Sequence, residues 1–245
     1  MWMPDVASVT AVHDGLVQLF VDEDDPISPS GIKSPAMLES ACARPHTGTG
    51  NIDKYGTLDL KLAALFHSLT KNHPFHNGNK RTATVSLLTA LHRNDRRLTA
   101  TVTDDIIFDF VVAVTANEFP KANHGLDVDD VVMEIASWIK ANSVTTAVEI
   151  PTMKAKQFLA RCEQAGATVK ASKSGAYIIS FNGNSIRFSR STRQLDGAVV
   201  RTYLRRLRLN EVESGLCVNE FQEGANGEKE QIFRFIAALK RLAKT

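Results

Sequence analysis

The stretch from His73 to Thr82 holds the residues whose types and spacing are best suited to chemistry. His73 is followed by a proline and a phenylalanine, and a glycine and an asparagine precede Lys80 and Arg81. Apolar residues then recur at helical spacing, so a helix is expected to begin near Asn79. A helix start presents unpaired backbone N–H groups and the positive end of the helix dipole. Together with two cations and a histidine, it predicts an anion site suited to phosphate chemistry.

A metal site is the alternative for the histidines of this stretch. His67, His73 and His76 are separated by six and three residues. This spacing does not place a pair on one helix face across Pro74, and no acidic residue lies beside them. Zinc hydrolase chemistry is therefore disfavoured.

The first 141 residues are predicted to be all-helical. Apolar periodicity predicts helices over residues 5–21, 34–43, 58–70, 79–92, 104–117 and 128–141. Residues 44–56, rich in glycine and polar side chains, are expected to form a long loop, and such loops are often functional. The anion site would lie between the third and fourth of these helices.

The composition is that of a globular protein, with 43% hydrophobic and 23% charged residues in 245. The sequence shows neither a signal peptide nor an apolar run of the ~20 residues that a membrane helix needs. Cys42, Cys162 and Cys217 lie far apart without metal-ligand spacing. We therefore expect a cytoplasmic protein with no membrane partner.

Charge divides the chain into two halves. Residues 1–150 contain 12 Lys and Arg against 19 Asp and Glu, a net charge of −7, whereas residues 151–245 contain 17 against 8, a net charge of +9. This polarity predicts two domains with different partners. The basic half could bind RNA, or dock on an acidic protein surface.

The spacing of apolar residues changes in the second half of the chain. A linker is predicted at residues 142–151, then a helix over 152–166, strands over 168–171, 176–181 and 185–189, and a basic helix over 197–209. Asn182-Gly183 between two strands is a strong hairpin signal. A loop over 211–227 and a final helix over 229–243 follow. We therefore expect a small α+β domain over residues 152–245, consisting of an αβββα core and a C-terminal helix.

The sequence His73-Pro74-Phe75 with Gly78-Asn79-Lys80-Arg81 resembles the Fic/Doc signature, HPFx[D/E]GN[G/K]R. The resemblance extends over about residues 5–125, and includes Met37-Leu38-Glu39-Ser40-Ala41 with Arg44-Pro45, and Lys61-Leu62-Ala63-Ala64-Leu65. It implies a helical fold and transfer of part of a nucleoside triphosphate to a protein hydroxyl. Most family members transfer AMP from ATP, whereas the Doc branch phosphorylates a translation factor and acts as a toxin.

The resemblance also implies roles for single residues. His73 matches the general base, a task that suits a histidine because its pKa lies near the operating pH. The backbone N–H groups of Gly78, Asn79 and Lys80 match the anion hole. Arg81 matches a ligand of phosphate oxygens. The implied cofactor is ATP or another nucleoside triphosphate.

Two positions of the motif bear on the reaction. Asn77 stands where the family carries Asp or Glu to hold Mg²⁺, and a neutral amide binds this hard cation more weakly than a carboxylate. Metal binding at Asn77 is therefore in question. Lys80 matches the Doc-like variant and adds charge and bulk where a diphosphate would lie, which favours phosphorylation over AMP transfer.

Residues 153–209 more faintly resemble the HicA-type double-stranded-RNA-binding fold. The segment Lys173-Ser174-Gly175-Ala176-Tyr177 stands where those toxins carry a catalytic histidine, and no histidine follows His124. The resemblance therefore implies binding without ribonuclease chemistry. The basic side chains concerned are Lys170, Lys173, Arg187, Arg190 and Arg193, with those of the following helix.

The sequence thus predicts a multi-domain protein, an all-α Fic/Doc-like domain over residues 1–141 followed by a small α+β domain. The expected function is a nucleotide-dependent transferase that phosphorylates or AMPylates a protein hydroxyl, as a Doc-like toxin or stress effector. The candidate partners are a translation factor as target and an antitoxin. The alternative is a catalytically degenerate binding protein whose C-terminal domain docks on RNA or protein.

Overall fold

A computed structural model describes residues 1–50, 52–121, 125–145, 152–207, 209 and 231–245. The predicted loop over 211–227, most of the predicted linker and the first residues of the predicted final helix lie outside these ranges. No helix of the described part is long and apolar enough to cross a membrane.

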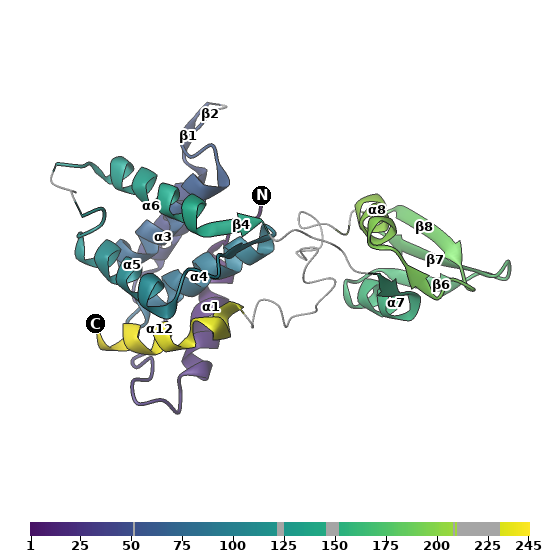
Figure 1. Cartoon of the computed structure of the whole chain (residues 1–245), viewed down its shortest axis with the longest axis horizontal. Coiled ribbons are helices and arrows are strands. Elements are labelled where there is room, and N and C mark those ends of the chain that lie inside the picture. Colours follow the sequence, from purple (N-terminus) through teal and green to yellow (C-terminus); the bar gives the residue numbers. More distant parts are fainter. Residues whose placement is uncertain (51, 122–124, 146–151, 208, 210–230) are drawn as a thin grey trace.

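The N-terminal part is helical, as the periodicity predicted (Figure 1). Its helices are α1 (Val6–Leu19), α2 (Pro35–Ala43), α3 (Leu58–Asn72), α4 (Asn79–Arg93), α5 (Asp104–Ala116) and α6 (Val128–Asn142), with a 3-10 turn η1 (Arg44–His46) after α2. Five of them begin at a side chain that accepts from the first turn, namely Asp5, Ser34, Thr57, Thr103 and Asp127. Such caps satisfy backbone N–H groups that a helix leaves unpaired, so each start is locally encoded.

Helices α3 and α4 form the centre of this part. Every residue of α3 from Lys61 to Thr70 is buried, and so is every residue of α4 from Arg81 to His92. A helix that is buried all round is held by its neighbours on every side. The loop between α3 and α4 carries the histidine motif, so this loop is fixed at both ends by the core.

Three strand pairs were not predicted from the sequence, namely β5 with β9, described below, and two pairs in the helical part. Strands β1 (Gly48–Thr49) and β2 (Ile52–Asp53) form an antiparallel hairpin inside the segment expected to be a loop. Strand β3 (Arg96–Leu98) pairs with β4 (Ser143–Thr145), which begins the segment expected to be a linker. Strands of two or three residues carry too little alternation for a pattern to show.

The described residues between 153 and 209 contain the predicted helix, three strands and helix in that order, together with two short strands, β5 and β9, that were not predicted. These are β5 (Met153–Lys154), α7 (Ala155–Gln164), β6 (Thr168–Ala171), β7 (Ala176–Phe181), β8 (Asn184–Ser189), β9 (Gln194–Leu195) and α8 (Gly197–Leu207). Strands β6, β7 and β8 form an antiparallel sheet in that order, and β5 pairs with β9. Asn182 and Gly183 both have positive φ, 43° and 79°, as the predicted hairpin turn requires.

Side chains of α7 and α8 pack with the sheet in one apolar cluster, around Phe158, Ile179, Phe188 and Leu204. A second apolar cluster contains side chains from α1 to α6.

The last helix differs from the expectation. Helix α12 (Ile236–Arg241) and the turn η2 (Leu242–Lys244) contribute Ala238, Leu239 and Leu242 to the apolar cluster of α1 to α6. The sequence prediction had grouped this helix with the basic region that precedes it. An amphipathic period indicates that a helix has a buried face, but it carries no information about which surface covers that face.

Candidate functional site

The loop between α3 and α4 is pinned to the segment before α2. The carbonyl of Pro74 accepts from the backbone N–H groups of Lys33 at 2.8 Å and Ser34 at 3.0 Å. The N–H of His76 donates to the carbonyl of Gly31 at 3.1 Å. The loop therefore lies along residues 31–34 much as a strand lies along its neighbour.

Asn79 closes the same loop from the other side. Its amide nitrogen donates to the carbonyl of Phe75 at 2.9 Å, and its amide oxygen accepts from the N–H of Phe75 at 2.9 Å. Both polar groups of this side chain are thereby used to shape the loop. Asn79 thus shapes the site, while its own backbone N–H lies at the start of α4.

His13 on α1 supports the loop from below, and the sequence analysis did not single it out. Its ring stacks on Phe75 with centroids 4.0 Å apart. Because the N–H of Gly31 donates to Nε2 at 3.2 Å, Nδ1 carries the proton and donates to Thr82 Oγ1 at 3.1 Å. Burial lowers the pKa of His13, which keeps it neutral. The only sequence signal was its spacing of four residues from Val9, within the apolar stripe of α1.

Gly78 sets the direction in which α4 begins. Its φ is +77°, and a Cβ on this residue would lie 2.9 Å from the side chain of Ile27. The expected anion hole is changed here, because the N–H of Gly78 donates to the side-chain oxygen of Asn77 at 2.6 Å. The N–H groups of Asn79 and Lys80, in the first turn of α4, have no acceptor inside the helix.

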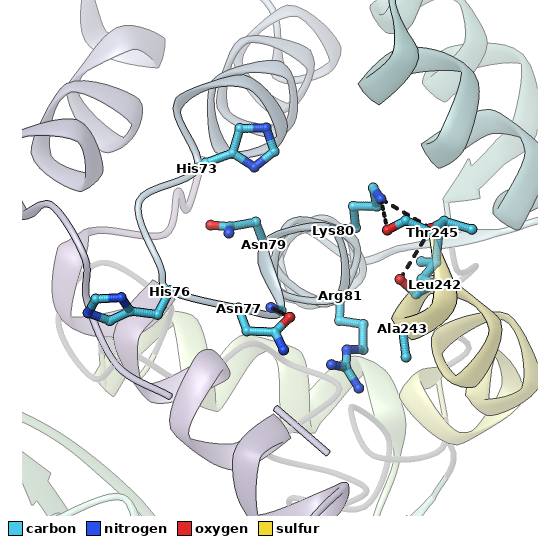
Figure 2. Close-up of a pocket in the computed structure, with 10 residues that line it drawn as sticks. His73, His76, Asn77, Asn79, Lys80, Arg81, Leu242, Ala243 and Thr245 are labelled. Carbon is cyan, nitrogen blue, oxygen red and sulfur yellow. Dashed lines mark hydrogen bonds between the residues drawn. The ribbon is translucent and has the colours of Figure 1, made fainter. Parts of the chain in front are cut away.

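All the residues singled out from the motif line one pocket of about 180 Å³. His73, Asn77, Gly78, Asn79, Lys80 and Arg81 are joined there by His76 and by three residues from the end of the chain, Leu242, Ala243 and Thr245. Figure 2 shows the ring of His76 turned away from Asn79 and Lys80. The structure therefore brings the sequence-predicted residues together and adds a segment that the sequence did not indicate.

His73 is electrostatically suited to accept a proton. It ends α3 in the left-handed conformation, with φ of 46°, and it is exposed. Its pKa is lowered from 6.5, first by partial burial and then by the positive charges of Lys80 and Lys71. A histidine with a lowered pKa is neutral at pH 7, which is the form that a general base needs.

Arg81 is held differently from the expectation. Its side chain is only 1% exposed, its Nη1 donates to the carbonyl of Asp25 at 3.0 Å, and its guanidinium lies 5.0 Å from the ring centre of Phe20. Among the described residues its Nε has no hydrogen-bond partner. Burial lowers its pKa. Arg81 thus carries a buried positive charge beneath the pocket and is fixed by the loop after α1.

Two comparisons relate this chain to known proteins. The model of the Fic/DOC family matches residues 4–91. Toxin Doc from Mycolicibacterium smegmatis (strain ATCC 700084 / mc(2)155) is 34% identical over 110 residues, which are 45% of this chain and 79% of that protein. The chain belongs to the Fic/Doc family. The region matched by the family model contains His73 to Arg81.

In this Fic/Doc chain, the position of Asn77 does not fit a carboxylate-held metal ion. Its amide oxygen accepts from the N–H of Gly78, and its amide nitrogen donates to the carbonyl of Ser28 at 3.0 Å. Within the described ranges no three His, Cys, Asp or Glu side chains are grouped as metal ligands. Hard cations such as Mg²⁺ prefer several oxygen ligands, carboxylates above all. The residues present therefore do not form a Mg²⁺ site of the kind the family resemblance implied.

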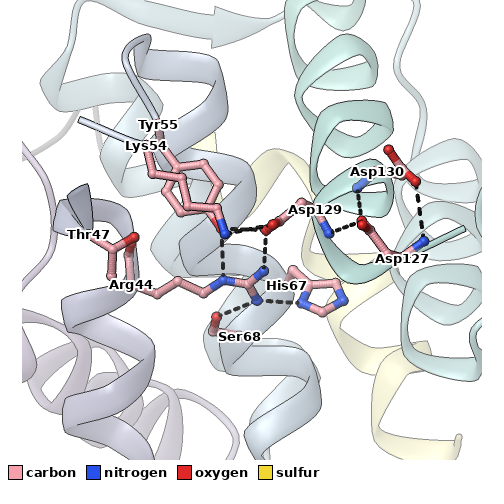
Figure 3. A network of polar contacts seen from close by, with 9 residues as sticks. All are labelled: Arg44, Thr47, Lys54, Tyr55, His67, Ser68, Asp127, Asp129 and Asp130. Carbon is pink, nitrogen blue, oxygen red and sulfur yellow. Dashed lines mark hydrogen bonds and ion pairs between the residues drawn. The ribbon is translucent and has the colours of Figure 1, made fainter. Parts of the chain in front are cut away.

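A second polar cluster ties the helices of the Fic/Doc region together (Figure 3). Arg44 donates to the hydroxyl groups of Tyr55 at 3.1 Å and Ser68 at 3.3 Å, and its Nη1 lies 3.2 Å from Nδ1 of His67. Asp129 on α6 accepts from Tyr55 at 3.0 Å and pairs with Lys54 at 2.6 Å. These contacts join the segment after α2 to α3 and α6.

The imidazole of His67 is engaged within this cluster. Burial and the charge of Arg44 lower its pKa to about 4. With Nδ1 facing a guanidinium, the ring acts as a neutral acceptor inside this cluster.

Proposed function

We propose that this chain is a Doc-like toxin that transfers a phosphoryl or nucleotidyl group from ATP, or another nucleoside triphosphate, to a hydroxyl of a protein. The observation that supports it most is that an exposed, neutral His73, the cation Lys80 and the start of α4 share one pocket. The similarity to Toxin Doc supports the biological role. An antitoxin as partner and a translation factor as target are parts of the same proposal.

The reaction needs one proton acceptor and a site for negative charge. The hydroxyl oxygen of the target forms a bond to phosphorus while its proton passes to His73. The bond from phosphorus to the departing ADP, or to pyrophosphate in AMP transfer, breaks and its electron pair leaves with the departing oxygen. Lys80 and the backbone N–H groups at the start of α4 stabilise the developing charge.

Phosphoryl transfer is favoured over AMP transfer at this site. The side chain of Lys80 lines the pocket beside Thr245 and adds charge and bulk there (Figure 2). An ammonium at that point is better placed to neutralise a terminal phosphate.

The position of the labelled phosphate in ATP distinguishes the possible reactions and tests the proposal. The purified chain is incubated with a cell lysate and ATP labelled at either the α or the γ phosphate. Protein label from the γ position alone indicates a kinase, and label from both positions indicates nucleotidyl transfer. His73→Ala should abolish the labelling, whereas His76→Ala, in the same pocket but turned away from Lys80, should retain it. Absence of label from both forms of ATP would refute the proposal for ATP.

A second candidate function is docking on double-stranded RNA by residues 152–209, which we propose form a separate α+β domain. Residues 164–195 contain two lysines and three arginines and neither aspartate nor glutamate. The apolar cluster that these residues share with α7 and α8 supports the domain boundary.

The register of the sheet separates its two faces. Val169, Ile179 and Ile186 are paired across the strands and face the apolar cluster, whereas Lys170, Ile178 and Arg187 are paired on the opposite, outer face. The neighbouring row on the outer face consists of Thr168, Ser180 and Ser185.

The chemistry of the outer face favours a duplex with 2′-hydroxyl groups. Cations and hydroxyls suit phosphate and 2′-hydroxyl contacts, which dominate recognition of RNA duplexes. The aromatic side chains of β7 and β8, Tyr177, Phe181 and Phe188, lie on the inner face and offer no surface for base stacking.

A matched pair of variants tests the outer face. Arg205 and Arg206 are exposed on α8, which packs on the inner face, so one duplex does not contact both sets of cations. We expect Lys170→Gln/Arg187→Gln in the full chain to lower the salt dependence of RNA-duplex binding by roughly 1–2 in the log–log slope. Arg205→Gln/Arg206→Gln removes the same charge and should change the salt dependence of RNA-duplex binding little. A DNA duplex or single-stranded RNA that binds more tightly, or equal effects of both variants, would contradict the proposal.

A further inference from the structure

A buried histidine lies beneath the motif loop and takes no part in the chemistry described above. His13 stands between Val9 and Leu16 on the buried side of α1, and its side chain is fully buried. An apolar side chain would be enough to fill this place in the core. A histidine brings two nitrogen atoms into the interior, where polar atoms are stable only with hydrogen-bond partners. The partners of His13 therefore indicate what the ring does.

The hydrogen bonds of His13 belong to a closed chain around the anion-binding turn. Nδ1 donates to Oγ1 of Thr82, in the first turn of α4, at 3.1 Å, and Nε2 accepts from the N–H of Gly31 at 3.2 Å. The carbonyl of Gly31 in turn accepts from the N–H of His76 at 3.1 Å. His13 and Gly31 thus join the two ends of the segment from His76 to Thr82, which contains the turn at Gly78.

The same ring also packs on the part of the loop that follows His73. It stacks on Phe75 with an angle of 10° between the ring planes. Phe75 forms an antiparallel bridge with Ile32, and the carbonyl of Pro74 accepts from the backbone N–H groups of residues 33 and 34. One side chain from α1 therefore contacts the loop after His73, the segment beside that loop and the first turn of α4.

We propose that His13 is a positioning residue of the transfer reaction, which holds His73 and the start of α4 in one relative arrangement. The inference rests on the proposed function, because it names a further residue that serves the same site. His13 is not among the residues that line the motif pocket, so it acts through the loop. A misplacement of about 1 Å between reacting groups can lower a rate roughly 100-fold, which makes such support matter.

Protonation of His13 would break this arrangement. An imidazolium carries a proton on both nitrogens, so Nε2 would meet the N–H of Gly31 donor to donor. Burial is the largest influence on the pKa of His13 and lowers it, while Asp14 on α1 raises it and Arg81 on α4 lowers it further. Transfer would then require that both His13 and His73 have lost a proton.

Two substitutions separate the packing of His13 from its hydrogen bonds. His13→Phe keeps a ring against Phe75 and removes both nitrogens, whereas His13→Gln places an amide oxygen near the position of Nε2, where it can accept from Gly31. We expect the rate of protein labelling at saturating ATP to fall about 100-fold in His13→Phe and to stay within about tenfold of the original in His13→Gln. The ATP concentration for half the maximal rate should be unchanged in both, because the groups at the start of α4 are retained.

A matched control lies at the other end of α4. His92 is 2% exposed and its Nδ1 lies 3.2 Å from Nε2 of Gln231, but it is about 15 Å along the helix from Thr82. His92→Phe removes the same groups from the core and should leave the labelling rate unchanged. Equal losses in His13→Phe and His13→Gln, or an equal loss in His92→Phe, would overturn the inference.

The steepness of the pH profile is a signature that packing alone would not give. Below the pKa of both histidines, the rate of the original chain should fall with about the second power of the proton concentration, because protonation of either ring stops transfer. In His13→Gln only His73 titrates, so the rate should fall with about the first power. The same steepness in both proteins would contradict the role of His13.

Hydrogen exchange measured by NMR does not depend on transfer. The N–H groups of Gly31 and His76 should exchange with solvent faster in His13→Phe than in the original chain, and that of Gly31 should be partly protected in His13→Gln. Unchanged exchange in His13→Phe would overturn the inference whether or not the chain transfers a group. Faster exchange, with no labelling by the original chain, would sustain the hold of His13 on the loop and count against the proposed function.

Discussion

The helical region around the motif and the region of residues 153–209 bury different kinds of side chain. Every buried polar or charged side chain among the described residues lies between His13 and Ser143. The apolar cluster of residues 153–209 contains apolar side chains and Cys162 only. Buried polar groups need defined partners, so they hold a loop in one geometry. An all-apolar core sets no such positions, and its charges act at the surface.

The two regions also differ in what covers their cations. Lys80 in the first region is covered by Thr245, and Arg81 is buried beneath it. Lys170 and Arg187 in the second region are exposed, and the described helices pack on the other face of their sheet. The first arrangement holds its cations within the fold, and the second leaves them exposed to solvent.

The strongest way to break this comparison is His73→Ala. Removal of a general base is expected to lower the transfer rate about 100- to 10,000-fold, measured as the initial rate of protein labelling. Lys170→Gln/Arg187→Gln should leave that rate unchanged. A His73→Ala enzyme within a few fold of the original rate would place the chemistry elsewhere.

The pH dependence of the transfer rate tests the same role of His73 as general base. A general base acts when it is neutral, and the pKa of His73 lies below the ordinary 6.5 because of partial burial and the nearby lysines. The transfer rate should therefore rise with pH through the acid range and be level from about pH 6.5 upward. A rise in the transfer rate centred above pH 7 would contradict this role of His73.

Phe75→Ala and Phe188→Ala compare the two cores. Phe75 is 1% exposed and stacks on His13, and Phe188 is 7% exposed in the other cluster. Each truncation should lower the free energy of unfolding of its own region by about 4 kcal/mol, measured by urea denaturation. Only Phe75→Ala should also weaken binding of an ATP analogue, because it loosens the motif loop. Equal effects on nucleotide binding would remove the distinction between the regions.

Acidification should destabilise the helical region through His67. Its folded pKa of about 4 lies below 6.5, so the unfolded chain binds a proton that the folded chain does not. Stability is complete above pH 6.5 and is lost as the pH falls toward 4, by up to about 3 kcal/mol. His67→Gln retains an acceptor for Arg44 and should flatten this dependence. Urea denaturation at pH 7.5 and pH 5 measures the change in the free energy of unfolding. The same pH dependence in the variant as in the original chain would rule out His67 as its cause.

The smallest effect is expected for Asn77→Asp. A carboxylate cannot donate to the carbonyl of Ser28, and loss of this bond should lower the free energy of unfolding by about 1 kcal/mol. The new carboxylate should make transfer more dependent on Mg²⁺, measured by titration of the ion. A variant with unaltered stability and no response to Mg²⁺ would show that Asn77 has neither role.

Much of the fold was predictable because its signals are local. The apolar stripes indicated the helices of the first 141 residues, and Asn182-Gly183 indicated the β7–β8 turn. The start of α4 at Asn79 was likewise expected from the motif. The hairpin of β1 and β2, the pairing of β3 with β4 and the pairing of β5 with β9 were missed, because strands of two or three residues show no alternation and form only against their partners.

The sequence by itself determined the chemical inventory of the site, from His73 to Arg81, and the turn that presents it. Only the tertiary structure decided how these groups are used. Asn77 is bonded to Ser28, Arg81 is buried against Phe20, and Thr245 lies on Lys80. Each contact joins residues far apart in the chain. Local patterns set backbone conformation and the apolar face of a helix, whereas packing chooses the surface on which that face lies.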